Sequence, residues 1–320
     1  MNPLNKIQVL MTKRFLHVFL ILALLSETAQ GGVVQAGLAA LNQGNETQAE
    51  QYFEQGAAQG NAHAMYWLGN TYQLEGGIKR LDAGRILLKA AQMGDPWAMN
   101  RLDPSNNESP CSMFGWPCDS KWLDKALATW KKQAEQGDGN AELALLLRDR
   151  PWYMRFIPVL GKKMYADKLV DAFSHGSDYA AFKILHTDIK DKYTYIKKVA
   201  LKGNCRAIFS YGVSLNDQKT QYLDWMRDAA KCGYSRGAEY ALIFYESNQD
   251  YEKAYFYGVL GVYLGNDPTL TDPHIESWIK NISIQDRENI QKRANSYIKN
   301  NNIMSTKNYS EFSEEFFGIY

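Results

Sequence analysis

Few residues of this sequence could carry chemistry, and their spacing does not fit a catalytic or metal site. Beyond residue 31 the histidines are His63, His175, His186 and His274, and no two of them stand four residues apart or in an HExxH frame. The segment GVSLN at 212–216 lacks the second Gly of a hydrolase G-x-S-x-G turn. The GKK at 161–163 has no Gly-rich loop that would cradle a phosphate. We therefore expect no catalytic residue, no cofactor, no metal and no enzyme activity.

The elements that carry these residues follow a repeat. A Gly ends one predicted helix, and four residues later an Ala lies in the next helix, where a small side chain lets paired helices approach closely. Gly has access to the left-handed conformation that such a helix end requires. The helix-ending glycine of this repeated pattern occurs at seven positions, 27 to 43 residues apart: Gly60, Gly94, Gly137, Gly176, Gly203, Gly233 and Gly265. A unit of this length predicts an all-α solenoid of about seven antiparallel helix pairs.

The best-preserved stretch, AMYWLGNTYQLEGGIKRLDAGRILLKAAQMGDPWAM, resembles the Sel-one-like repeat family, a relative of the tetratricopeptide repeat. The residues that carry the resemblance are Ala64, Leu68, Gly69, Tyr72, Gly76, Gly77, Ile78, Asp82, Ala90, Ala91 and Gly94. The match is specific over 57–99, fair at 124–147 and 220–245, and weak at 165–186 and 192–212. The resemblance implies a right-handed stack of helix pairs over residues 32–268 and a role in protein binding, often outside the bacterial cytoplasm.

A first insertion, residues 102–122, departs from the repeat and contains Cys111 and Cys118. In an exported chain this pair favours a small disulfide loop, and a zinc site is the alternative, although two Cys without nearby His make a poor one. Phe114 and Trp116 lie inside the loop. They form either a rigid anchor for a protein partner or a cover that folds back over the groove between repeats.

A second insertion, residues 148–165, contains two prolines that prevent one continuous helix. Its aromatic residues Trp152, Tyr153 and Phe156 are candidates for partner binding, with packing onto the solenoid as the alternative. A membrane surface is a third possibility, but no amphipathic helix of useful length fits between the prolines.

Two further cysteines, Cys205 and Cys232, fall at the same end of adjacent predicted helices. The repeat phase puts Cys205 two residues after Gly203 and Cys232 immediately before Gly233. This placement favours a disulfide between repeats, and the alternative is two buried free thiols.

The two ends of the chain differ from the repeats. Lys13 and Arg14 precede an eleven-residue apolar run and a small-residue cleavage site near Gly31, which indicates a signal peptide over 1–31. Translation could begin at Met11, and an uncleaved anchor is the alternative. Residues 269–320 predict a polar-faced helical cap followed by a tail that either docks on the stack or remains mobile.

Composition and export narrow the function. The formal net charge is +1, and the residues beyond 31 carry about −1 because Lys6, Lys13, Arg14 and Glu27 are removed, so nothing favours nucleic acid as a partner. We expect a periplasmic scaffold that binds a protein and is monomeric when unbound, with no stable membrane span. The segment CSMFGWPCD and the repeat after it are similar to immunity proteins that bacteria keep against toxic effectors, notably lipases delivered by type VI secretion. The alternative function is an envelope adaptor for secretion, cell-wall enzymes or host contact.

Overall fold

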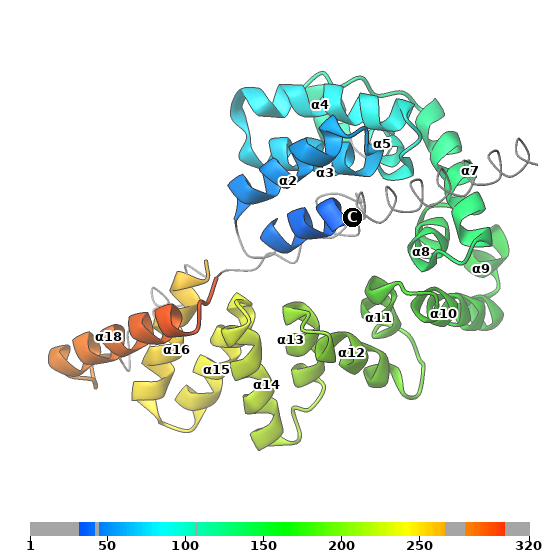
Figure 1. Ribbon diagram of the computed structural model, residues 1–320. Helices are drawn as coiled ribbons and strands as arrows, with labels where there is room; N and C mark the ends of the chain where they lie inside the picture. The colour runs from blue at the N-terminus through cyan, green and yellow to red at the C-terminus, as the bar shows by residue number, and fades with distance from the viewer. Residues whose placement is uncertain (1–31, 42–44, 106–107, 266–278, 305–320) are drawn as a thin grey trace, which may run out of the picture. The chain divides into compact units, whose positions relative to one another are not determined.

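The computed structural model describes residues 32–41, 45–105, 108–265 and 279–304 (Figure 1). Every regular element in these ranges is a helix, and the fold class is all-α, as the sequence predicts. The expected signal peptide at 1–31 and the tail at 305–320 lie outside the described residues.

The chain divides into two compact units. Unit 1 comprises residues 1–40 and 46–122, and unit 2 comprises residues 41–45 and 123–320. The first insertion and the second insertion therefore belong to different units, and each is described within its own unit.

Unit 1 consists of helix pairs whose large side chains fill the space between them. After a helix within residues 32–41 come α2 (Glu46–Ala58), α3 (Ala62–Glu75), α4 (Gly77–Gln92), α5 (Pro96–Arg101) and α6 (Glu108–Met113). Helix α7 (Lys121–Glu135) begins at the end of this unit. The fully buried side chains of the core include Phe53, Tyr66, Trp67, Leu87 and Leu102.

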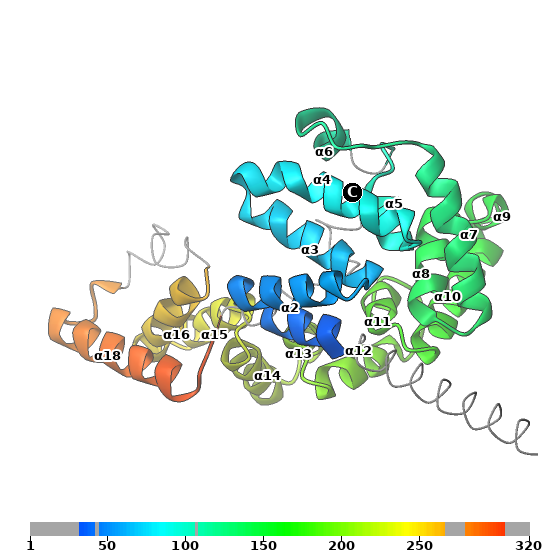
Figure 2. The same ribbon diagram turned by 45° about the horizontal axis from the view of Figure 1, so that its top comes forward.

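Unit 2 continues with helices that pack mainly on their neighbours in sequence, which is the contact pattern of a solenoid. Its helices are α8 (Gly139–Arg148), α9 (Trp152–Phe156), α10 (Pro158–Ser174), α11 (Asp178–Ile184), α12 (Lys192–Leu201), α13 (Cys205–Val213), α14 (Lys219–Lys231), α15 (Ser235–Ser247), α16 (Tyr251–Tyr263) and α18 (Ile284–Asn300). Figures 1 and 2 show the helices from α12 to α16 side by side in chain order.

The seven glycines that end the first helices of the predicted repeats all adopt a left-handed backbone conformation, as expected. Their φ angles lie between 79° and 103°. In six of the seven turns the next helix then buries a small residue four positions on: Ala64, Ala98, Ala141, Ala180, Ala207 and Gly237. A side chain in place of the glycine would be strained, and a larger residue in place of the alanine would push the two helices apart.

Side-chain caps fix where the second helices begin. Asn61, Asp95, Asp138 and Asn204 each accept a hydrogen bond from the backbone N–H of the residue three positions on, at 2.7–3.1 Å. Such caps satisfy N–H groups that the first turn of a helix otherwise leaves unpaired. The position directly after the glycine therefore sets the start of the helix.

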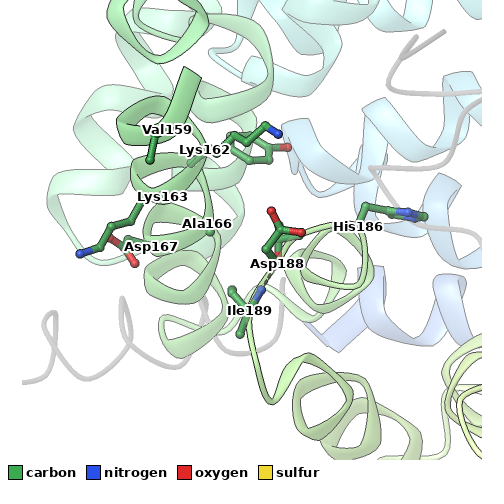
Figure 3. Close-up of a pocket in the computed structure, with 10 residues that line it drawn as sticks. Val159, Lys162, Lys163, Ala166, Asp167, His186, Asp188 and Ile189 are labelled. Carbon is green, nitrogen blue, oxygen red and sulfur yellow. Dashed lines mark hydrogen bonds between the residues drawn. The ribbon is translucent and has the colours of Figure 1, made fainter. Parts of the chain in front are cut away.

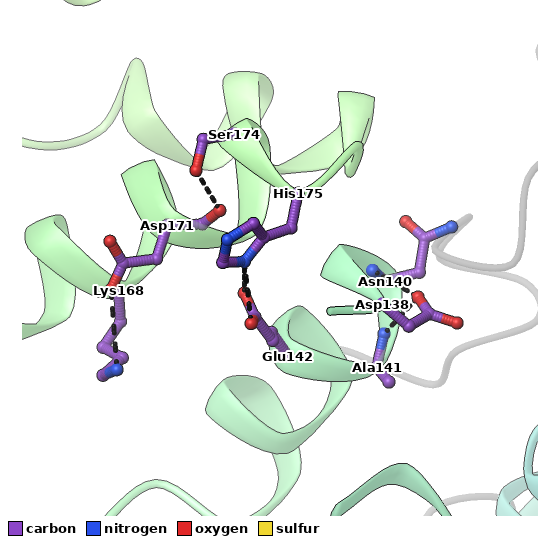
Figure 4. A network of polar contacts seen from close by, with 8 residues as sticks. All are labelled: Asp138, Asn140, Ala141, Glu142, Lys168, Asp171, Ser174 and His175. Atoms are coloured by element: carbon purple, nitrogen blue, oxygen red, sulfur yellow. Dashed lines mark hydrogen bonds and ion pairs between the residues drawn. The ribbon is translucent and has the colours of Figure 1, made fainter. Parts of the chain in front are cut away.

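Neighbouring pairs in unit 2 approach closely where α8 begins and α10 ends (Figure 4). The Gly139 N–H donates to the His175 carbonyl at 3.2 Å, and a Cβ at Gly139 would lie 2.2 Å from the carbonyl oxygen of Ala172. Beside this contact the His175 imidazole Nδ1 lies 2.9 Å from a carboxylate oxygen of Glu142. His175 therefore joins adjacent repeats.

The cap is described in part. Helix α18 packs on α16 and buries Ile290, Ala294 and Ile298 on one face, while the rest of its surface is mostly polar apart from the exposed Ile284. Residues 266–278, which the sequence assigns partly to the cap, lie outside the described residues.

Candidate partner-binding surfaces

The histidines occupy structural positions or lie apart from other reactive groups. His63 Nδ1 lies 2.9 Å from Asp95, and its Nε2 accepts from the Trp67 indole N–H at 3.3 Å. A neutral imidazole with its proton on Nδ1 satisfies both contacts, and Asp95 also caps α5, so this group links two repeats. His186 lies in an exposed loop, and His274 is outside the described residues.

The described ranges bring no group of three or more His, Cys, Asp or Glu side chains together as metal ligands would be placed. Within the same ranges no helix is long and apolar enough to cross a membrane. The candidate site residues that the sequence predicts lie in the two insertions.

The first insertion is closed by a disulfide between Cys111 and Cys118, whose Cα atoms are 5.8 Å apart. Inside the loop the Trp116 side chain is buried and lies against Gly84 of α4, where an added Cβ would be 2.6 Å from the indole ring. The Trp116 indole N–H donates to the Arg80 carbonyl at 3.0 Å. The loop is thus fastened to α4 by its largest side chain.

For the first insertion the sequence left two alternatives, a rigid anchor for a partner and a cover that folds back over the repeats. Trp116 adopts the second, because Gly84 leaves room for its indole on α4, and it is therefore not available as an anchor. Phe114 is half-buried beneath the Arg80 guanidinium, which lies 5.0 Å from the ring centre. Met113 is the exposed apolar side chain of this loop.

The second insertion is shorter than the sequence suggested. Pro158 begins α10, since a proline is favourable in the first turn of a helix, where its missing N–H has no partner to lose. Residues 158–165 therefore belong to the first helix of the next pair. The short helix α9 is held down by Met154, which is buried, and by Gly161, where a Cβ would lie 2.3 Å from the Met154 carbonyl oxygen.

Around this fastening, large apolar side chains face solvent. Trp152 is 69% exposed, Phe156 74% and Val159 85%. With Ile157 and Leu160, which are also exposed, they occupy five of nine consecutive positions. We call these five residues the α9–α10 apolar surface. Tyr153 is half-buried and lies edge-on to Trp152, with 6.0 Å between the ring centres.

The structure thus places two of the predicted candidates, Trp152 and Phe156, at the surface and adds three that sequence reasoning missed. The missed residues lie in the run FIPVL at 156–160. Five consecutive residues without a polar side chain cannot all lie on one buried face of a helix, and that was the available signal.

A cavity of about 660 Å³ continues from this surface (Figure 3). One wall is a face of α10 that includes Val159, Lys162 and Lys163, and the other is the loop at 186–189. Val159 belongs to both the α9–α10 apolar surface and the cavity. A bound chain could therefore rest on the apolar surface and extend a side chain between α10 and the loop.

This region carries charges of both signs, because Asp167 and Asp188 line the cavity together with Lys162 and Lys163. The sequence from 150 to 163 has Arg150, Arg155, Lys162 and Lys163 and no acidic residue. Arg150 is engaged, because its guanidinium lies 4.1 Å from the ring centre of Tyr165. Burial raises the pKa of the Tyr165 phenol, and the nearby Arg150 charge opposes that rise, so Tyr165 is a neutral wall of the cavity at neutral pH.

The remaining two cysteines are joined, as their repeat phase suggested. Cys205 at the start of α13 and Cys232 at the end of α14 form a disulfide with Cα atoms 5.5 Å apart. The bond ties two helices that also pack on each other.

Comparison with known proteins adds little to this description. No protein-family model and no curated protein matches the sequence. A protective antigen of uropathogenic Escherichia coli strains that displays an SLR fold is 17% identical, over 84% of this chain and 68% of its own, with a TM-score of 0.39. A Sel1 repeat protein from Oxalobacter formigenes is 20% identical, over 82% of this chain and 99% of its own, with a TM-score of 0.41. These identities and TM-scores are too low to assign this chain to a family. Its description as a helical-repeat protein depends on its own helices and turns.

Proposed function

We propose that this chain is a periplasmic scaffold that binds a protein partner through the α9–α10 apolar surface. The observation that carries the proposal is the exposure of Trp152 and Phe156 on a helix of only five residues. Tryptophan and large apolar side chains dominate the energy of protein interfaces, where they fill pockets of the partner.

The contrast with the other tryptophans strengthens the case. Trp67, Trp97, Trp116, Trp122 and Trp130 are all buried, and Trp225 is half-buried. Trp152 is the exposed one among the tryptophans that the structure describes. An aromatic residue that stabilises the fold is buried, whereas one that awaits a partner stays accessible.

Export is supported by two independent features. The first 31 residues have the charge, apolar run and small residues of a signal peptide. Both disulfides form in the structure, and such bonds persist in the periplasm and not in the reducing cytoplasm.

The sharper form of the proposal is immunity against a secreted toxic effector of the lipase type. The scaffold would inhibit by occlusion: α9 and the start of α10 would cover the mouth of the effector's active site and keep substrate out. A surface led by Trp152, Phe156 and Val159 suits this task, because an enzyme that acts on lipids has an apolar entrance to its site.

The test places a photo-crosslinking amino acid at Phe156 in the exported chain and identifies the captured protein by mass spectrometry. We expect one enzyme, which the purified scaffold then inhibits at one-to-one stoichiometry. The pair Trp152→Ala and Phe156→Ala should raise the dissociation constant at least roughly thirtyfold, since each anchor contributes more than about 1 kcal/mol.

The matched control is Leu201→Ala, which removes another exposed apolar side chain of unit 2. It should leave inhibition unchanged. Equal loss of inhibition in the control would refute the assignment of the surface. Capture of several envelope proteins without any inhibition would refute immunity and support the envelope adaptor instead.

A further inference from the structure

The cavity between α10 and the loop at 186–189 has single charges of opposite sign on its two walls. Lys162 comes from α10 and Asp188 from the loop, and Figure 3 shows both side chains reaching into the space between these elements. Neither forms an ion pair with another side chain among the described residues. Both charges are therefore available to a ligand.

The other two charges on the cavity wall lie on the same helix. Lys163 and Asp167 stand four residues apart on α10, one helical turn, so each partly neutralises the field of the other. Lys162 has no acidic neighbour of this kind, because the residues three and four positions away are Pro158, Val159, Tyr165 and Ala166. His186 also lines the cavity, but Figure 3 shows its imidazole pointing away from α10.

The loop wall of the cavity is held in place by its own hydrogen bonds. The Thr187 hydroxyl donates to the Ile184 carbonyl at 2.7 Å and accepts from the Ile189 N–H at 3.4 Å. The Lys192 ammonium donates to the Thr187 carbonyl at 3.1 Å. Because the loop and α10 are both formed without a ligand, binding would not have to order either wall.

Between the two charges the lining is largely apolar. Val159 and Ala166 on α10 and Ile189 in the loop supply aliphatic groups, and the Tyr165 phenol is neutral at neutral pH. The volume of about 660 Å³ lies within the range of small-molecule sites, which combine apolar walls with a few polar groups.

The arrangement selects a ligand that carries both charges. A purely anionic ligand that pairs with Lys162 would bring its charge near Asp188, and a purely cationic ligand would meet the opposite problem. We propose that this cavity binds a short peptide with free amino and carboxyl ends and an apolar side chain. Its carboxylate pairs with Lys162, its ammonium pairs with Asp188, and its side chain packs on Val159 and Ile189.

The experiment is calorimetric titration of the full chain with the dipeptide leucyl-alanine, compared with its N-acetylated and C-amidated forms. We expect saturable binding of one dipeptide per chain. Each capped form should bind roughly three- to fivefold more weakly, because it loses one ion pair that remains close to solvent. Added salt should weaken the binding of the uncapped dipeptide.

Two variants assign the charges to residues. Lys162→Gln should weaken the uncapped dipeptide by the same factor as C-amidation and should have no further effect on the amidated form. Asp188→Asn should behave in the same way toward N-acetylation. Both side chains are exposed, so neither variant should lower the melting temperature. The matched control is Lys219→Gln, which removes an exposed lysine at the start of α14 and should leave the affinity unchanged.

The absence of saturable binding at millimolar dipeptide would overturn the proposal. So would equal affinity for the capped and uncapped forms, or equal losses in Lys162→Gln and Lys219→Gln. The pair Trp152→Ala and Phe156→Ala should leave dipeptide binding unchanged, because neither residue lines the cavity. The titration needs no protein partner, so this site and the proposed function can each fail while the other stands.

Discussion

The two insertions make opposite predictions for the same substitution, tryptophan to alanine. Trp116 is 5% exposed and Trp152 is 69% exposed. A tryptophan side chain can bury about 200 Å², and burial contributes about 25 cal/mol per Å² as an upper bound. Nearly all of this area is covered at Trp116, and less than a third is covered at Trp152.

Trp116→Ala should therefore lower the free energy of unfolding of unit 1 by about 3–5 kcal/mol, the range for buried aromatic residues. It also removes the indole N–H that donates to the Arg80 carbonyl. Trp152→Ala should lower stability by about 1 kcal/mol, because roughly 60 Å² of covered area is lost.

The assay is urea unfolding of both variants, followed by circular dichroism under non-reducing conditions so that the disulfides stay intact. Binding to the captured partner is measured on the same samples at low urea. Trp152→Ala should weaken binding with little loss of stability, and Trp116→Ala should do the reverse. Equal losses of stability, or a stable Trp116→Ala variant that no longer binds, would contradict the assignment of Trp116 to the fold and Trp152 to the interface.

Three further predictions concern the stack itself. Gly139→Ala should cost at least about 1–3 kcal/mol by overpacking, because the new Cβ would meet the end of α10 at 2.2 Å, and thermal unfolding measures it. Replacing Cys205 and Cys232 by Ser should lower the free energy of unfolding by about 3.6 kcal/mol, because their disulfide has a sequence separation of 27. Replacing Cys111 and Cys118 by Ser should lower it by about 2.5 kcal/mol, because the loop that their disulfide closes is shorter. Denaturant midpoints of the two variants test whether the first loss is the larger. Burial raises the pKa of Tyr257 to about 12, with Arg227 opposing, so the unfolded chain loses this proton first. Stability present below pH 10 should then fall by up to about 2.7 kcal/mol as the pH rises to 12, and Tyr257→Phe should remove that part of the alkaline loss in unfolding measured across this range.

The sequence predicted the repeat because its signals are local. Gly60 and Gly94 end their helices for a reason that involves a single residue's backbone, and Asn61 and Asp95 cap the next helices within three residues. Such features recur wherever the turn recurs. Reading them in phase was therefore enough to place the helix pairs and to bring Cys205 beside Cys232.

The placement of the insertions could not be predicted in the same way. Gly84 lies within a helix, where a glycine is unfavourable by itself, and its role is clear only when the Trp116 indole is seen to occupy the missing side chain's space. The sequence showed that the two prolines prevent one continuous helix, but it did not show that Pro158 begins α10, where Gly161 packs closely on Met154. Both outcomes depend on residues more than a turn away in sequence.

These differences are consistent with the proposal that the two insertions have different roles. A disulfide closes the loop between Cys111 and Cys118, and the buried Trp116 packs this loop on α4, so Trp116 stabilises the fold and is not exposed to a partner. In the second insertion, Gly161 packs closely on the buried Met154, whereas Trp152 and Phe156 are 69% and 74% exposed. Exposed apolar area of this kind favours aggregation unless something covers it. A protein partner that covers this surface, as proposed, would bury that apolar area, and it would meet charges of both signs, because Lys162, Lys163, Asp167 and Asp188 line the adjoining cavity.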